Sequence, residues 1–301
     1  MKALVTKFEA YLLTEKRVAY NTFSAYKRDI AQYIDYLEKQ KIDLQQATIE
    51  TIKKFLQHLY DQNMTARSMA RKISSLKTFY SYLHDHHQFV HHAQELTIPK
   101  IEKRLPQYLS EEQIEQLLGT TEHDKSNTGI RNKVMVYLLY VSGMRISELV
   151  TMKKSAVHFD TGFLAVDGKG GKGRMVPLPE HMMVLLKDYI ENIHPRLITR
   201  DGNKYETEYL FPIFYGQKAK HITRQAFWVI LKKFAESINL KDLVSPHKLR
   251  HSLATHLLRK GADLRSLQLL LGHEQLSTIQ IYTHLETDHL RDVYDKKHPR
   301  S

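Results

Sequence analysis

The 301-residue sequence contains no cysteine. This excludes disulfide bonds, thiolate zinc sites and a cysteine nucleophile, and it suits a reducing cytosol. Long apolar runs are also missing, since the longest nearly apolar stretch, VMVYLLYVSGM, is too short to cross a bilayer. The N-terminal segment MKALVTKFEAYLL carries Lys7 and Glu9 inside its apolar stretch, which argues against a signal peptide. We therefore expect a cytoplasmic protein with no membrane contact.

Glycine and proline are scarce, at 12 and 8 residues, while 42% of the chain is hydrophobic. This balance excludes a disordered chain and fits a globular protein of about two domains. Acidic residues are outnumbered: 45 Lys and Arg against 33 Asp and Glu give a formal net charge of +12. Because the basic excess is spread along the chain, we expect a long polyanion as partner, although charge alone indicates only non-specific attraction.

Apolar residues at helical spacing occupy the first hundred residues. In NTFSAYKRDIAQYIDYLEKQ they recur at steps of three and four, with Asn21 or Thr22 as the expected N-cap. The segment TARSMARKISSLKTFYSYLHD repeats this pattern. Its other face carries three candidate DNA contacts: Arg67, Arg71 and Ser74. Arginines and hydroxyls on one helix face can follow phosphates, but a merely solvated face is the alternative.

A change of composition near residue 100 predicts a domain boundary. The histidine tract HDHHQFVHH matches no standard ligand spacing, so we expect no metal there. LTIPKIEKRLPQYLS, with Pro99 and Pro106, reads as a linker, and Ser110 then caps a new helix. The chain is expected to divide into a helical domain at 1–100, a linker at 101–109 and a mostly helical second domain at 110–301.

The stretch DGKGGKGRMVPL, residues 167–178, raises the question of a phosphate-binding loop. Gly168 and Gly173 have the spacing of a nucleotide P-loop, but Arg174 and Met175 stand where that motif needs Lys and Ser or Thr. The flanking GFLAV and RMVPLP suit strands, so the glycines lie at the tip of a β-hairpin. We expect a basic hairpin that is not an ATP site. Two of its residues are further candidate DNA contacts: Lys172 and Arg174.

Two other segments combine arginine with helix starts. In YVSGMRISELV, Arg145 follows a buried stretch, and an arginine so placed usually pairs with a carboxylate, here Glu148. In SPHKLRHSLATHLL, Ser245 caps a helix whose first turn carries His247 and Arg250. A helix N-terminus together with a guanidinium makes an anion site.

The last two segments carry a histidine and a tyrosine. LRSLQLLLGHEQ ends a helix at Gly272, directly before His273, and STIQIYTHLE contains Tyr282. Taken alone, such residues are more often caps or packing. A metal alternative pairs His247 with His251 at i and i+4, but no acid lies between them and no third ligand is evident. We expect no metal and no cofactor.

The order and spacing of GMRISEL, GKGGKGR, HKLRHSLATHLLRKGADLR, LLGH and IYTH closely resemble the tyrosine recombinases, above all the Xer-type chromosomal site-specific recombinases. The resemblance covers essentially the whole chain, including the ending YDKKHPRS. It departs at Leu253 and Ile279, where phenylalanine and threonine are usual. It implies a mainly α (α+β) fold, with a helical core-binding domain and a mostly helical catalytic domain that has a small β-hairpin. Together these form a C-shaped clamp on DNA.

The resemblance also implies a catalytic set: Arg145, Lys169, His247, Arg250, His273 and Tyr282. In it Tyr282 is the nucleophile, and the two arginines grip the scissile phosphate with the histidines beside them. Lys169 is the general acid for the leaving oxygen, and Lys172 is the alternative. A covalent 3′-phosphotyrosine conserves the bond energy, so neither metal nor ATP is implied.

The implied partners are duplex DNA with a two-armed recombination site, further protomers of this chain or of a second Xer-type recombinase in a tetramer, and a septal DNA translocase. The implied role is resolution of chromosome or plasmid dimers before segregation, in the cytoplasm at the nucleoid. Three alternatives are weighed: a mobile-element integrase, a type IB topoisomerase and a noncatalytic DNA-binding protein. The last leaves the six catalytic residues unexplained.

Overall fold

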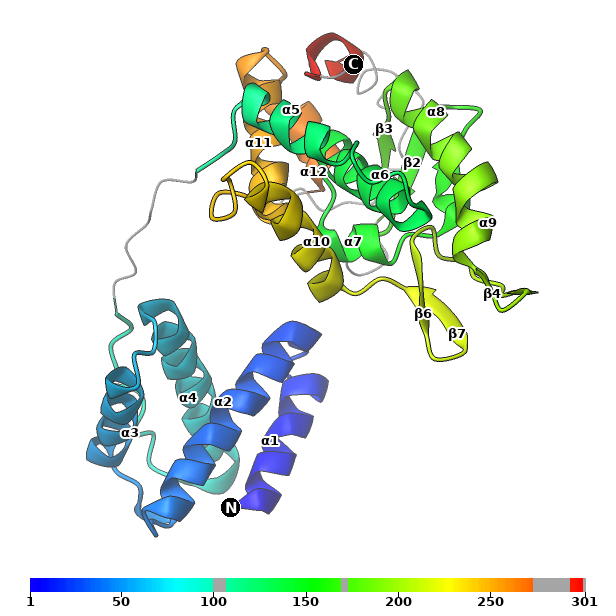
Figure 1. The fold of residues 1–301 in the computed structure, drawn as a ribbon. Helices are drawn as coiled ribbons and strands as arrows, with labels where there is room; N and C mark the ends of the chain where they lie inside the picture. Colours follow the sequence, from blue (N-terminus) through cyan, green and yellow to red (C-terminus); the bar gives the residue numbers. More distant parts are fainter. Residues whose placement is uncertain (100–106, 169–172, 273–292, 300–301) are drawn as a thin grey trace. The chain divides into compact units, whose positions relative to one another are not determined.

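A computed structural model of the chain describes residues 1–99, 107–168, 173–272 and 293–299. The chain separates into two units, Met1–Leu105 and Pro106–Ser301, and each is treated by itself. Helices with small antiparallel sheets make up the described residues (Figure 1), so the predicted mainly α fold class is confirmed. No helix among these residues is long and apolar enough to span a membrane.

The first unit is built from helices: α1 (Lys2–Thr14), α2 (Tyr20–Lys39), η1 (Leu44–Gln46), α3 (Ile49–Asp61) and α4 (Ala66–His87). Helix α2 begins at Tyr20 after Ala19, so the expected cap at Asn21 or Thr22 is wrong. No side chain caps this helix end, and a buried apolar face that includes Ile30 and Leu37 holds the helix instead. Helix α4 has the predicted inward face, and it extends into the histidine tract.

Several aromatic rings lie among the aliphatic side chains of the core of the first unit. Phe8, Phe55 and Phe79 are buried, and the buried hydroxyls of Tyr33 and Tyr80 lie 2.7 Å apart in a hydrogen bond. Burial is the main cause that raises the pKa of Tyr80 to about 12, so this hydroxyl stays neutral. A neutral hydrogen-bonded pair satisfies both polar groups inside the core.

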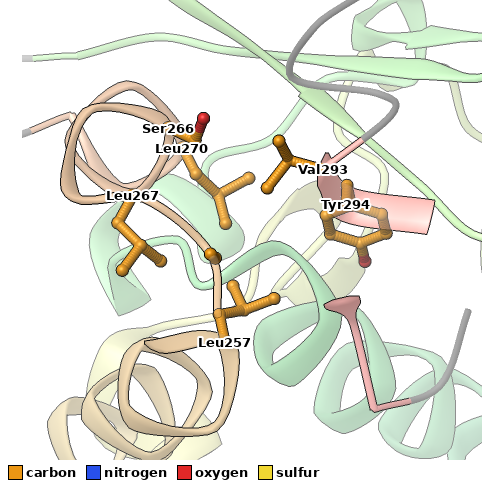
Figure 2. A pocket seen from close by; sticks show the side chains of 7 residues that line it. Leu257, Ser266, Leu267, Leu270, Val293 and Tyr294 are labelled. Atoms are coloured by element: carbon orange, nitrogen blue, oxygen red, sulfur yellow. The ribbon is translucent and has the colours of Figure 1, made fainter. Parts of the chain in front are cut away.

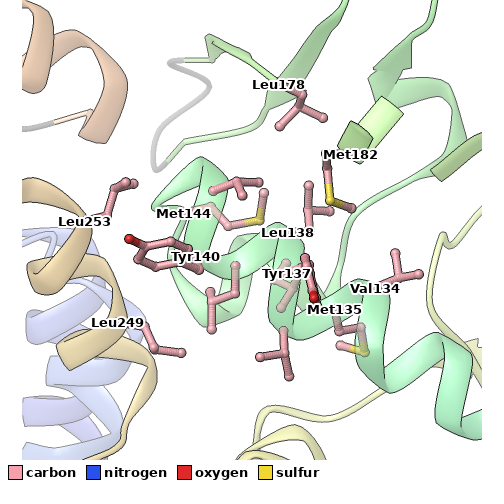
Figure 3. Packing of buried hydrophobic residues seen from close by; sticks show 14 of the residues in the cluster. Val134, Met135, Tyr137, Leu138, Tyr140, Met144, Leu178, Met182, Leu249 and Leu253 are labelled. Carbon is pink, nitrogen blue, oxygen red and sulfur yellow. The ribbon is translucent and has the colours of Figure 1, made fainter. Parts of the chain in front are cut away.

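The second unit is also mainly helical: α5 (Glu111–Thr120), α6 (Asn127–Ser142), α7 (Ile146–Val150), η2 (Lys154–Ala156), α8 (Glu180–Asp188), η4 (Tyr189–Ile193), α9 (His194–Leu197), α10 (Arg224–Glu236), α11 (Pro246–Arg259) and α12 (Leu264–Leu271). Helix α6 is buried on all sides from Val134 to Ser142, as expected for a central core helix. Figure 3 shows its side chains packing toward Met182 of α8 and Leu253 of α11. Ser110 caps α5 as predicted.

The sheets are antiparallel and small: β1 (Val157–His158) with β2 (Phe163–Val166) and β3 (Arg174–Pro177), β4 (Thr199–Arg200) with β5 (Asn203–Lys204), and β6 (Pro212–Tyr215) with β7 (Lys218–His221). Strands β2 and β3 form the predicted hairpin, and its tip at 169–172 lies outside the described residues. The other two hairpins were not predicted. Strands β4 and β5 are short and exposed, so they lack alternation, and only the Asp201–Gly202 turn signals them.

Leu109 belongs to the core of the second unit, although the sequence placed it in the linker. Its N–H donates to Ser252 Oγ at 2.8 Å, and its carbonyl accepts from His256 Nε2 at 2.8 Å. His256 Nδ1 lies 3.0 Å from the Tyr140 hydroxyl in a hydrogen bond that a neutral ring accepts. Burial lowers the pKa of His256 and favours that neutral form. Both backbone groups of Leu109 are thus bound by α11, the helix that carries Arg250.

The described end of the chain packs against the same helices. Residues 293–297 are helical, and Tyr294 is buried with its hydroxyl donating to the Val141 carbonyl at 2.9 Å. Figure 2 shows Tyr294 at a small apolar pocket with Leu257 of α11 and Leu270 of α12. This segment therefore adds to the core around α12.

Ser252→Ala tests the anchor of Leu109. The substitution leaves a buried N–H without an acceptor, so we expect the free energy of unfolding to fall by about 1–3 kcal/mol. The single tryptophan, Trp228, lies in α10, so its fluorescence during urea unfolding reports the second unit. The control is Ser237→Ala, whose exposed hydroxyl donates only to a carbonyl of its own helix end. Equal losses of unfolding free energy in both variants would show that the Ser252 hydroxyl does not anchor Leu109.

Candidate active site

Arg145 stands at the junction of α6 and α7. Gly143 ends α6 with a φ of +58°, and a Cβ there would lie 2.8 Å from side-chain atoms of Leu253 and Leu271. The left-handed backbone thus favours glycine, and a larger residue would force the Leu253 and Leu271 side chains to shift. Arg145 follows as the residue before α7, and its Nη1 donates to Glu148 Oε1 at 2.8 Å. The predicted pair of Arg145 with Glu148 is confirmed.

Arg250 enters the same place from α11. Ser245 caps this helix by accepting from the Lys248 N–H, as expected. Arg250 is buried, and its guanidinium donates to the carbonyl of Gly143 at 2.7 Å and to that of Leu271. Burial, followed by the charges of neighbouring arginines, lowers the pKa of Arg250 to about 10, so the group is still protonated at neutral pH.

His247 lies in the first turn of α11, three residues before Arg250. Unlike Arg250, its side chain is exposed to solvent. Both predicted residues are therefore on the first turns of one helix, with the arginine turned inward and the histidine outward. The metal alternative finds no support in the described part of the chain, where no group of His, Asp and Glu could hold a metal ion.

Arg174 is the first residue of β3, and the prediction that it contacts DNA is corrected. Its side chain is only 4% exposed, because it shares the inward face of the strand with Val176. Its Nη2 and Nη1 donate to Glu148 at 2.8 and 3.2 Å, and its Nε donates to the Leu270 carbonyl at 2.8 Å. The position two residues before a buried valine was the signal in the sequence that this arginine points inward.

The three arginines meet at the C-terminal end of α12. The last carbonyls of a helix have no partner within the helix and carry partial negative charge. Here each of three consecutive carbonyls accepts from a different arginine: Leu270 from Arg174, Leu271 from Arg250, and Gly272 from Arg145 at 3.2 Å. Gly272 ends the helix with a φ of +66°, and a Cβ there would lie 3.1 Å from Arg174 Cδ. The helix end thus gathers guanidinium groups from three distant segments.

Glu148 is the carboxylate of this arginine cluster, which comprises Arg145, Arg174, Arg250 and Glu148. Its two oxygens accept four hydrogen bonds, from the backbone N–H and Nη1 of Arg145 and from Nη1 and Nη2 of Arg174. Burial raises the pKa of this carboxyl, but its bonds and charge contacts with the arginines outweigh burial and leave the pKa below its usual range. Glu148 is therefore ionised, and one negative charge faces three positive ones. The surplus suits a bound anion.

Arg145 is the member of the cluster that reaches solvent, with 37% of its side chain exposed. A ligand approaching the cluster therefore meets this guanidinium first. Four further predicted residues lie outside the described residues: Lys169, Lys172, His273 and Tyr282. His273 directly follows Gly272 in the chain, at the helix end where the arginines meet.

The candidate DNA contacts of the first unit lie on α4. Arg67 is exposed, whereas Arg71 forms an ion pair with Asp29 at 3.0 Å and Ser74 donates to the Ala70 carbonyl at 3.0 Å. Sequence reasoning missed Lys72, which is buried and donates to Asp29 at 2.9 Å. Arg71 and Lys72 therefore share one oxygen of Asp29, which ties the partly exposed arginine to a buried ion pair.

Comparison with known proteins identifies both units. Residues 107–289 match the phage integrase family, and residues 5–87 match the phage integrase N-terminal SAM-like domain. The chain is 38% identical to the tyrosine recombinase XerD of Staphylococcus aureus and 37% identical to that of Listeria monocytogenes serotype 4b. Each alignment covers 100% of this chain and 100% of the relative.

Solved structures show the same fold. The XerH site-specific recombinase bound to its difH substrate has a TM-score of 0.68 at 22% identity, covering 96% of this chain and 83% of that one. The Tn1549 transposon integrase in complex with transposon right end DNA has a TM-score of 0.65 at 19% identity, covering 97% and 98%.

These matches define the class first: the chain is a site-specific tyrosine recombinase, an enzyme that cuts and rejoins duplex DNA through a tyrosine. It belongs to the phage integrase family, with both the N-terminal and the catalytic domain of that family present. The resemblance stated from the sequence motifs is confirmed. The arginine cluster lies within the region that matches the family's catalytic part.

Glu148→Gln tests the balance of charge in the cluster. It removes the carboxylate that pairs with buried Arg174 in the described part of the chain, so we expect the free energy of unfolding to fall by about 3–5 kcal/mol. Trp228 fluorescence during urea unfolding is the measurement. The matched control is Glu208→Gln, which breaks an exposed ion pair with Lys153 and should change stability little. If both variants lose the same unfolding free energy, Glu148 does not balance the charge of the arginine cluster.

Proposed function

We propose that the arginine cluster is the phosphate-binding part of the active site and that six residues carry the reaction: Arg145, Lys169, His247, Arg250, His273 and Tyr282. The observation that carries this proposal is the surplus of guanidinium groups at the end of α12. In an enzyme that cuts DNA, the anion for such a site is the scissile phosphate.

Arg145 and Arg250 stabilise the charge that develops at phosphorus. Attack on a phosphodiester gives a five-coordinate phosphorane with extra negative charge on its nonbridging oxygens. A guanidinium stays protonated and can donate two parallel hydrogen bonds to such oxygens. Because the two arginines are held by backbone carbonyls before DNA arrives, little reorganisation is needed. Loss of one preorganised donor typically costs about 10²–10³ in rate.

Tyr282 attacks the phosphate, and the leaving group is the 5′ oxygen of the cut strand. A tyrosine hydroxyl has an ordinary pKa of about 10, so it needs nearby cations and a base. His247 and His273 share or accept its proton near neutral pH. Lys169, or alternatively Lys172, protonates the departing oxygen, a contribution of about 10²–10⁴ in rate. The resulting 3′-phosphotyrosine keeps the bond energy, and reversal of the same steps rejoins the strands.

The two units bind one duplex as a C-shaped clamp in this proposal. The basic excess of both units supports it, as does the exposed Arg67 on α4. Arg71, Ser74 and Lys172 are the other proposed contacts to DNA. Each neutralised phosphate releases counterions, so binding should weaken with salt at a log–log slope of about −0.9 per contact.

The proposed assembly is a tetramer that exchanges strands between two DNA sites through a Holliday junction. Its protomers are copies of this chain or of this chain and a second Xer-type recombinase, with a septal DNA translocase as activator. The proposed role is resolution of chromosome or plasmid dimers before segregation, in the cytoplasm at the nucleoid. The full-length identity of 38% to XerD supports this role over that of a mobile-element integrase.

Covalent capture of protein–DNA adducts from the source cell tests the proposal. Wild type should yield adducts at one short chromosomal or plasmid site, and Tyr282→Phe should yield none, since it lacks the attacking oxygen. DNA binding should be unchanged in the variant, as measured by gel shift on the recovered site. Tyr294→Phe is the matched control, because this buried hydroxyl donates to the Val141 carbonyl in the core of the second unit.

The distribution of the adducts decides between roles. Adducts at the ends of a mobile element would show that the role is integration of that element and not resolution of dimers. Adducts scattered over the genome would indicate relaxation of DNA without a specific site. Adducts that persist in Tyr282→Phe would show that the nucleophile is a residue other than Tyr282.

A further inference from the structure

Arg174 is the arginine of the cluster that no proposed step uses. It is almost fully buried, and all three of its guanidinium nitrogens donate to groups of the protein. Two of the three bonds go to Glu148 and the third goes to the end of α12. A cation held in this way has no donor facing solvent for a phosphate, so its function must be sought inside the cluster.

We infer that Arg174 is a positioning residue for strand cleavage: it fixes Glu148 and the end of α12, and through them it sets the orientation of Arg145 and Arg250. The inference rests on the proposed function of those two arginines. It assigns Arg174 no contact with DNA.

The first route runs through Glu148 to Arg145. Each carboxylate oxygen accepts one bond from Arg174 and one from Arg145, so the carboxylate is saturated and its rotamer is fixed. Without Arg174, half of those bonds are lost and the carboxylate can turn. Arg145 Nη1 donates to Glu148 Oε1, so a turn of the carboxylate would also move the exposed guanidinium of Arg145.

The second route runs through α12 to Arg250. Arg174 holds the Leu270 carbonyl, and the next carbonyl in the chain, that of Leu271, holds Arg250. The following one, that of Gly272, holds Arg145. Because these two carbonyls are adjacent at one helix end and neither is held by a bond within the helix, a shift of that end displaces both acceptors together. A misplacement of about 1 Å at a reacting group can cost about 10² in rate.

Only arginine fits this position. Its planar fork offers donors in fixed directions, toward a carboxylate on one side and a carbonyl on the other. A lysine ammonium keeps the positive charge but cannot make the parallel bonds to both oxygens. Arg174→Lys therefore separates geometry from charge, and Arg174→Met removes both.

The experiment measures single-turnover cleavage on a nicked duplex carrying the site recovered from Tyr282 adducts. At saturating DNA, Arg174→Met should lower the first-order rate of adduct formation about 10²-fold, and Arg174→Lys at least about 10-fold. The Kd for the same duplex should stay within about threefold of wild type, since a buried residue makes no phosphate contact. Arg131→Met is the control: Arg131 is another buried arginine of this unit, bonded to the Pro212 carbonyl at 3.1 Å and outside the cluster.

Arg131→Met should lose stability yet cleave at the wild-type rate per folded molecule. If Arg174→Met also cleaves at the wild-type rate, the inference is wrong and Arg174 serves only the fold. If Arg174→Met weakens duplex binding as much as cleavage, and Lys restores both, Arg174 is instead a phosphate contact. Neither result would contradict the proposed function or the role of Tyr282 as its nucleophile.

A measurement without DNA keeps the inference testable if wild type forms no adducts. The side-chain Nε–H signals of Arg145 and Arg250 in the full-length chain, labelled at arginine, report how firmly these groups are held. Both signals should shift and exchange faster with water in Arg174→Met and Arg174→Lys, and neither should change in Arg131→Met. Unchanged signals in the Arg174 variants would overturn the inference, whatever the outcome with DNA.

Discussion

The arrangement of the second unit depends on how three positive charges are kept together in a partly buried place. Guanidinium groups repel one another, and each loses hydration on burial, so their approach needs compensating negative charge. Glu148 supplies one full charge and the carbonyls at the end of α12 supply partial ones. The compensation is incomplete, since three guanidinium groups face one carboxylate, and burial together with the neighbouring arginines lowers the pKa of Arg250. In the proposed function, a phosphate of the DNA supplies the missing negative charge.

Backbone shape and charge act together here. Gly143 lets α11 and α12 approach the end of α6, and its carbonyl accepts from Arg250. Gly272 ends α12 so that the Arg174 side chain passes close by. A Cβ at Gly143 would force the Leu253 and Leu271 side chains to shift, and a Cβ at Gly272 would crowd the Arg174 side chain. The core around α6 therefore serves the site directly, because the same contacts that bury apolar surface also set the distances between cations.

Much of this could be predicted from the sequence, where the signals are local. Periodicity gave the helices, the pair of Arg145 with Glu148 followed from spacing, and the hairpin strands followed from alternation. The burial of Arg174 was missed because its partners lie 26 and 96 residues away in the chain. Use of backbone carbonyls as acceptors leaves no trace in residue identity at all. For the same reason Leu109 looked like linker, since only its peptide group is bound by α11.

The bonds to Leu109 bear on how this protein can be divided into fragments. A shortened chain that starts at Ser110 would retain every residue of the proposed catalytic set, and the capped start of α5 would make it look like a natural beginning. Yet it would expose the Ser252 hydroxyl and the His256 ring, which the missing peptide group had satisfied. A fragment that keeps these bonds must therefore include Leu109, a residue that no proposed catalytic step uses.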